Sequence, residues 1–187
     1  ILHLGASVRY SSHGDAEANE LVFSGSAPSG LINQTFIRAE VTEAINQWRF
    51  GAEMIWVWDR FYMQGEYLRA YVNRFNAVKN YTGDGGYLQA GYVLLGGRYG
   101  YSAATGMSRG PGAKTLELNG RYSITDTNDG KAGIRGGKQD DLSLGATYYF
   151  NRYLAVKANY TLVMLDKYTR DGDQTFSMLQ GRFQVNF

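Results

Sequence analysis

The sequence predicts an all-β protein, an antiparallel transmembrane β-barrel of which this chain supplies eight strands. Three observations indicate this fold. Apolar and polar residues alternate with a period of two over segments of about ten residues. No helical period continues beyond two turns, and short turns alternate with long polar connections along the chain.

The eight predicted strands have one apolar face and one face of polar residues and glycine. The first alternates leucine, alanine and valine with histidine, glycine, serine and arginine, and the second places three tryptophans on one face. The fourth is apolar enough that its faces are hard to separate, whereas the last four alternate regularly. In order, the predicted strands are residues 1–10, 47–58, 61–72, 85–98, 116–123, 141–150, 154–162 and 179–187.

The connections between these segments are of two kinds. Two short turns lie at 58–61 and 150–153, and 99–112 is of medium length where a short turn is expected. Long polar connections span 12–46, 73–84, 126–138 and 167–173. Short turns at one end and long loops at the other are typical of membrane barrels. We therefore expect a single domain over 1–187, with 12–46 as a long loop inserted between the first and second strands.

A soluble β-sandwich also alternates, so the placement of aromatic residues matters. In a sandwich the apolar face is a core of mixed aromatic and branched aliphatic side chains. Here the aromatic residues of the apolar faces gather near strand ends, as in the girdles of membrane barrels. They are Trp56, Trp58, Tyr122, Tyr148, Phe150, Tyr160, Phe183 and Phe187.

The polar faces predict the lining of a lumen. Their cations are Arg9, Arg49, Arg121, Lys157 and Arg182, and their acids are Glu53, Glu66, Glu117 and Asp141. Inward cations favour passage of anions, but five cations against four acids is close to balance, and inward charges also pair to brace a barrel wall. Inward glycine, serine, threonine and asparagine predict a wide lumen. The loop 12–46 either folds inward as a constriction or lies outside, and an exterior position is favoured because loops run over surfaces.

Other functions fit the sequence less well. A net charge of +2 without a lysine- or arginine-rich run argues against nucleic acid as a partner. The absence of cysteine excludes disulfides and thiolate metal sites. An outer-membrane enzyme needs a histidine beside its nucleophile, and the two histidines, His3 and His13, both lie near the N-terminus. We expect no enzyme activity, no cofactor and no metal. The alternative to a channel is a closed eight-stranded barrel, filled by side chains, that acts as a structural or partner-binding outer-membrane protein.

Five blocks of the sequence resemble, in order, the phosphate-selective porin O/P family. They are RFYMQGEYLRAYVNR (60–74), GGYLQAGYVLLGG (85–97), LELNGRYSITDTNDG (116–130), GGKQDDLSLGATYYFNRYLAVKANYTLV (136–163) and LQGRFQVNF (179–187). The resemblance covers most of residues 47–187 and corresponds to the C-terminal half of the family. The chain also begins within a predicted strand, without an initiating methionine, so we expect either a mature secreted chain or a piece of a longer protein.

The resemblance implies a 16-stranded, homotrimeric porin of the Gram-negative outer membrane that conducts small anions such as phosphate. Membrane lipid, lipopolysaccharide and other outer-membrane proteins are the partners it implies. The closing alternation that ends on Phe183, Val185 and Phe187 resembles the signal for assembly into the outer membrane.

Overall fold

The structure is a computed structural model that describes residues 1–12, 19–29, 34–75 and 78–186. Strands are the only regular secondary structure in these described residues, and every pair of hydrogen-bonded strands is antiparallel. The prediction of an all-β antiparallel protein is therefore confirmed. The strands are β1 (Leu2–Ser12), β2 (Leu21–Ser26), β3 (Thr35–Val41), β4 (Ala44–Trp58), β5 (Phe61–Arg74), β6 (Tyr81–Leu95), β7 (Gly100–Ser102), β8 (Met107–Arg109), β9 (Thr115–Asp129), β10 (Ile134–Tyr149), β11 (Leu154–Leu165) and β12 (Gln174–Val185).

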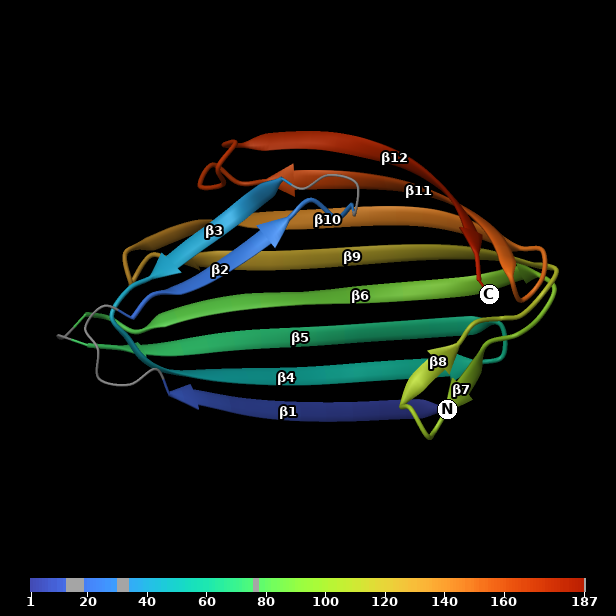
Figure 1. Cartoon of the computed structure of the whole chain (residues 1–187), viewed down its shortest axis with the longest axis horizontal. Coiled ribbons are helices and arrows are strands. Elements are labelled where there is room, and N and C mark those ends of the chain that lie inside the picture. Colours follow the sequence, from blue (N-terminus) through green and yellow to red (C-terminus); the bar gives the residue numbers. More distant parts are fainter. Residues whose placement is uncertain (13–18, 30–33, 76–77, 187) are drawn as a thin grey trace.

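Eight of these strands form one sheet in the order β1-β4-β5-β6-β9-β10-β11-β12 (Figure 1). Each predicted segment overlaps one strand of this sheet, although the ends differ, and the sheet follows the chain as a meander. The strand count is corrected, because the described residues contain twelve strands and β2–β3 and β7–β8 form hairpins of their own. No closed barrel is seen, because no described strand pairs with the free edges of β1 and β12.

The short turns form where the sequence predicts them. Asp59 adopts a positive φ of 53° in the β4–β5 turn, a conformation that aspartate tolerates better than most residues. In the β10–β11 turn, the side-chain oxygen of Asn151 accepts hydrogen bonds from the backbone N–H groups of Tyr153 and Leu154 at 2.8 and 2.9 Å. Both turns satisfy backbone groups locally, so the strands can reverse in two to four residues.

Two of the predicted long loops are largely strand. β9 continues to Asp129 and β10 begins at Ile134, which leaves a tight turn in place of a loop over 126–138. The Asp129 carboxylate closes this turn by accepting from the backbone N–H groups of Lys131 and Ala132 at 3.0 and 3.1 Å. Likewise β5 extends to Arg74 and β6 starts at Tyr81. Polar residues in extended strand ends alternate without an apolar face, so the sequence alone does not distinguish them from loop.

Both hairpins lie against the same face of the sheet (Figure 1). Phe36 of β3 packs with Val163 and Leu165 of β11, and its ring lies 5.5 Å from that of Phe176 in β12. At the opposite end of the strands, the ring of Tyr99, just before β7, lies 5.2 Å from that of Tyr62 in β5. The prediction that the segment 12–46 lies outside is therefore wrong for its β2–β3 part, because apolar side chains of β3 pack against the sheet.

Arg74 fastens three connections at one end of the sheet. Its Nε donates to the carbonyl of Thr42 at 2.8 Å, and its Nη2 donates to the hydroxyl of Thr42 at 3.1 Å. Its Nη1 donates to the carbonyls of Lys79 and Ala132 at 3.3 and 3.4 Å. One guanidinium thus joins the link between β3 and β4 to the β5–β6 and β9–β10 connections.

Replacing Arg74 by methionine is expected to lower the free energy of unfolding by about 1–2 kcal/mol, because several charge-assisted hydrogen bonds are lost. Arg74→Lys should recover a minor part, since a single ammonium cannot reproduce the fork. Urea unfolding of the protein in lipid vesicles measures both. Equal stability of Arg74→Met and the unmodified protein would show that the clamp contributes nothing.

Candidate functional site

The two faces of the sheet differ in chemistry. We call the face that carries both hairpins the inner face and the opposite one the outer face. The outer face exposes large apolar side chains along its strands, among them Leu4 at 69%, Leu144 at 59% and Leu179 at 81% exposure. The inner face carries polar residues and glycine between its charges. A sheet with a water-exposed apolar face requires a nonaqueous neighbour or a partner to cover it.

All nine predicted lumen residues lie on the inner face, as the strand register shows. Arg9 of β1 stands directly opposite Arg49 of β4, and Lys157 of β11 stands opposite Arg182 of β12. Glu53 and Glu66 form a third pair of like charges, between β4 and β5. Arg121, Glu117 and Asp141 lie on β9 and β10. Like charges placed directly opposite are destabilising in a sheet, so these pairs are not explained by wall stability.

Two of the acids are enclosed by protein donors. Glu117 is 8% exposed, and its two carboxylate oxygens accept from the hydroxyls of Tyr99 and Tyr149 at 2.7 and 2.8 Å. Asp141 is also buried, and it accepts from Gln139 Nε2 at 2.9 Å and from Ser123 Oγ at 3.3 Å. The inner face therefore presents less accessible negative charge than the sequence count suggests.

The cations are more available than Glu117 and Asp141, whereas Glu53 is exposed and Glu66 is half-buried. Arg9, Arg49 and Arg182 are exposed, and Lys157 is half-buried. No ion pair joins these four residues or Arg121 to a carboxylate in the part of the chain that the structure describes. Among the nine predicted residues, five accessible cations thus face two accessible acids, whereas the sequence count was nearly balanced.

A cavity of about 620 Å³ lies between hairpin β2–β3 and the middle of the inner face. It brings together three predicted residues, Glu66, Arg121 and Asp141, and adds Pro28 and Ile37 from the hairpin side. The guanidinium of Arg121 lies 3.9 Å from the centre of the Tyr87 ring, which holds the cation against the wall. Arg9, Lys157 and Arg182 do not line this cavity.

At the other end of the inner face, hairpin β7–β8 contacts the sheet through His3. The Nδ1 atom of His3 lies 2.5 Å from the hydroxyl of Tyr101, and its Nε2 lies 3.5 Å from a carboxylate oxygen of Glu53. The alternation of the first strand puts His3 on its polar face. The alternation does not predict the contact with Tyr101, because that residue is ninety-eight positions away in the chain. The two hairpins therefore cover both ends of the inner face.

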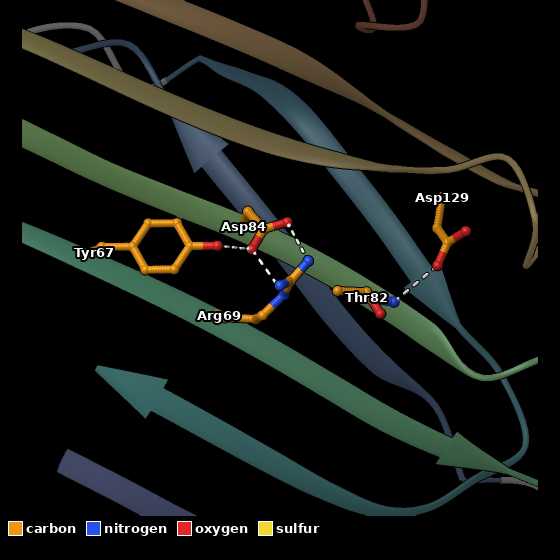
Figure 2. Close-up of polar contacts among 5 residues, drawn as sticks. All are labelled: Tyr67, Arg69, Thr82, Asp84 and Asp129. Carbon is orange, nitrogen blue, oxygen red and sulfur yellow. Dashed lines mark hydrogen bonds and ion pairs between the residues drawn. The ribbon is translucent and has the colours of Figure 1, made fainter. Parts of the chain in front are cut away.

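The outer face carries a row of charges that the sequence analysis missed. Arg69, Asp84, Asp126 and Lys138 stand in register across β5, β6, β9 and β10. Figure 2 shows the Asp84 carboxylate accepting from Tyr67 and pairing with Arg69, with 3.1 Å between Arg69 Nε and Asp84 Oδ1. On β10, Asp140 repeats this pattern with Tyr122 and Lys138.

This charged row marks one border of the apolar band. On β1 and β4 the apolar band extends one residue pair beyond the level of the charged row, to the directly opposed Tyr10 and Trp48. On β10 the band ends one residue pair before that level, because Asp140 already carries a charge. A border that shifts from strand to strand is expected of strands tilted in a barrel. Once the strands are extended to their observed ends, residues 69, 84, 126 and 138 each continue the alternation of the outer-face residues on their own strand. This alternation is the sequence signal that could have identified the row.

The predicted assembly residues lie partly within the structure. Phe183 and Val185 are exposed on the outer face, at 66% and 47%, and Phe187 lies outside the described residues. Within residues 1–12, 19–29, 34–75 and 78–186, no group of three histidine, aspartate or glutamate side chains is placed to hold a metal ion. The same residues include no helix of the length and apolarity needed to cross a membrane.

Comparison with known proteins gives a family for the chain. The family model described as phosphate-selective porin O and P matches residues 1–187, the whole chain. None of the curated proteins compared gives a significant match. The matched family consists of porins, which are channels and not enzymes, and porins of this kind have the antiparallel β architecture seen in the sheet. The chain therefore belongs to the phosphate-selective porin O and P family.

Proposed function

We propose that this protein forms an outer-membrane diffusion channel for small anions such as phosphate, with the inner face lining the channel. The observation that carries the proposal is the difference in availability between the charges of this face. The pairs Arg9–Arg49 and Lys157–Arg182 have no described acidic partner, whereas Glu117 and Asp141 are occupied by protein donors. A row of weakly held cations lets anions bind and leave.

Hairpin β2–β3 serves in this proposal as a constriction. It lies over the inner faces of β9 and β10, and the cavity that contains Arg121 lies beside it. Its contacts are extensive: besides the Phe36 cluster, Ala39 and Val41 pack with Val72 and Tyr81. A solute moving along the inner face then passes between the hairpin and the wall.

Family membership supports our proposal for the rest of the assembly. Additional strands would pair with the free edges of β1 and β12 to close a barrel in the Gram-negative outer membrane, with lipid and lipopolysaccharide on the outer face. Three copies would form a trimer. Phe183, Val185 and Phe187 would serve as the assembly signal, because Phe183 and Val185 lie on the outer face at the end of β12 and the sequence alternation continues to Phe187.

Charge reversal at Arg49 tests the proposal. In planar lipid bilayers under a KCl gradient, the unmodified protein is expected to show a zero-current potential with the sign of chloride selectivity. Arg49→Glu should shift this potential towards potassium, because it reverses one accessible cation in the lumen. Arg152→Glu makes the same change of charge in the exposed β10–β11 turn and should have a much smaller effect.

Two results would contradict the proposal. One is an unmodified protein that gives no conductance or selects for potassium. The other is an equal shift for Arg49→Glu and Arg152→Glu, which would assign selectivity to overall charge and not to the inner face.

A further inference from the structure

A second cavity, of about 440 Å³, lies between β2 and the inner face of β4, β5 and β6. Its walls include Val22 and Phe23 from the hairpin, Leu68 and Ala70 from β5, and Arg49 from β4. Gly83 and Gly85 of β6 also line it, so β6 contributes no bulky side chain there. The volume falls within the range of about 300–1,000 Å³ found for small-molecule sites.

The wall of this cavity is unusually apolar for the inner face. Leu68 is 50% exposed there. Its direct neighbours on the adjacent strands are Gly51 and Gly85, which have no side chains to cover it. Phe23 presents its ring to the sheet from the hairpin, and Val22 lines the cavity beside it. Inorganic phosphate gains nothing from such surface, whereas an apolar group does.

Arg49 supplies the inner-face cation of this cavity, whose lining also includes Arg69 and Asp84, an ion pair of the outer row. The Cζ atom of Arg49 lies 6.0 Å from the centre of the Phe23 ring, so the guanidinium sits at the edge of the apolar wall. Arg9 stands directly opposite Arg49 and adds a second positive charge at this level. Neither arginine forms an ion pair with a carboxylate among the described residues.

We propose that this cavity is a binding site for small organic anions with an apolar body, such as aromatic carboxylates. The anionic group pairs with Arg49, and the apolar body lies against Leu68 and Phe23. The inference rests on the proposed channel function and names a solute class for it beyond inorganic anions. A cation beside apolar surface holds such a solute better than either feature alone, and the exposure of both keeps the interaction reversible.

Inhibition of the channel current by benzoate and by acetate tests this proposal. Both carry one carboxylate, and benzoate adds a phenyl ring. In the unmodified protein, benzoate should halve the chloride current at a concentration about tenfold lower than acetate, the ratio expected when about 55 Å² of ring surface leaves water. Inorganic phosphate serves as the third probe and should not gain from the apolar wall.

Variants at two positions separate the contributions. Leu68→Asn should bring benzoate inhibition to the level of acetate and leave acetate unchanged, whereas Leu68→Met, which keeps an apolar side chain, should retain the preference. Because Leu68 is half exposed, neither change removes a core residue. Arg49→Gln should weaken inhibition by both carboxylates together.

The outcomes distinguish the inference from the proposed function. A chloride-selective channel in which benzoate inhibits no better than acetate would overturn the inference and leave the channel function standing. A benzoate preference that survives Leu68→Asn would place the site elsewhere and overturn the assignment of this cavity. A potassium-selective or nonconducting protein would contradict the proposed function itself.

Discussion

Replacing Met54 by arginine is expected to lower the free energy of unfolding in lipid by about 2–4 kcal/mol, the cost of a charge on the lipid-facing side of a barrel near the bilayer midplane. Met54 lies on the outer face, with Leu4 and Gly65 as its direct neighbours. Trp48 and Trp58 mark the two ends of the same face of β4, so Met54 is near the middle of its apolar band. Urea unfolding in phospholipid vesicles measures the change.

Ser143→Arg is the matched control for Met54→Arg. Ser143 lies on the inner face, where its hydroxyl is 2.9 Å from that of Thr161 and where it lines the cavity that contains Arg121. This variant should fold with nearly unchanged stability and should alter the conductance. A loss of stability below about 0.5 kcal/mol for Met54→Arg, or failure of Ser143→Arg to fold, would show that the faces are assigned wrongly.

A valine at Gly136 is expected to push hairpin β2–β3 away from the sheet. A Cβ atom at this position would lie 2.5 Å from the Cβ of Ala39 in β3 and 2.5 Å from the hydroxyl of Thr127. Either the hairpin or β10 must move, and overpacking of this kind costs about 1–3 kcal/mol. Since the hairpin is the proposed constriction, the single-channel conductance should rise. Unfolding in lipid and bilayer recordings measure the two effects.

Gly181→Val provides the control for the Gly136 variant. Gly181 lies on the exposed outer face of β12, and a Cβ atom there would have no heavy atom within 4 Å. This substitution should leave stability and conductance close to those of the unmodified protein. Equal conductance for both variants would mean that the hairpin does not restrict the channel.

The strands of the main sheet could be predicted because burial of one face leaves a period of two in the sequence. The faces follow from the same period, which is why Arg9, Arg49 and the other inward charges share one side of the sheet. The strand ends could not be placed. Beyond the apolar band both faces meet water, and residues such as Thr125 to Asp129 continue β9 without any alternation in polarity.

The hairpins depend on contacts between distant residues that leave no local pattern. Gly136 and Gly137 occupy a bulge in β10 that lets β3 approach the sheet, and Ala39 fits into the space. Nothing within the segment 36–44 indicates which face it will meet. Sequence patterning therefore predicted the wall of the proposed channel but not the segments that fold against it.

The charge of the site shows the same limit. A count along the strands treats Glu117 and Asp141 as equal to the cations. The donors to Glu117 are Tyr99, just before β7, and Tyr149 of the neighbouring strand β10, whereas Gln139 lies two residues from Asp141 on the same strand. Accessible charge depends on these tertiary partners, so selectivity could not be derived from formal charge alone.

The central claim, that the inner face meets water while the outer face meets lipid, is tested most directly by two adjacent cysteines. The chain has no cysteine of its own, so Ser143→Cys and Leu144→Cys each carry a single thiol. These neighbours point to opposite faces of β10, and Leu144 is the more exposed of the two in the isolated structure. The measurement is the rate at which a charged, water-soluble thiol reagent modifies each variant in intact membranes. We predict rapid modification of Ser143→Cys, with a change in conductance, and protection of Leu144→Cys. Faster modification of Leu144→Cys would contradict the account, because that face would then be in water.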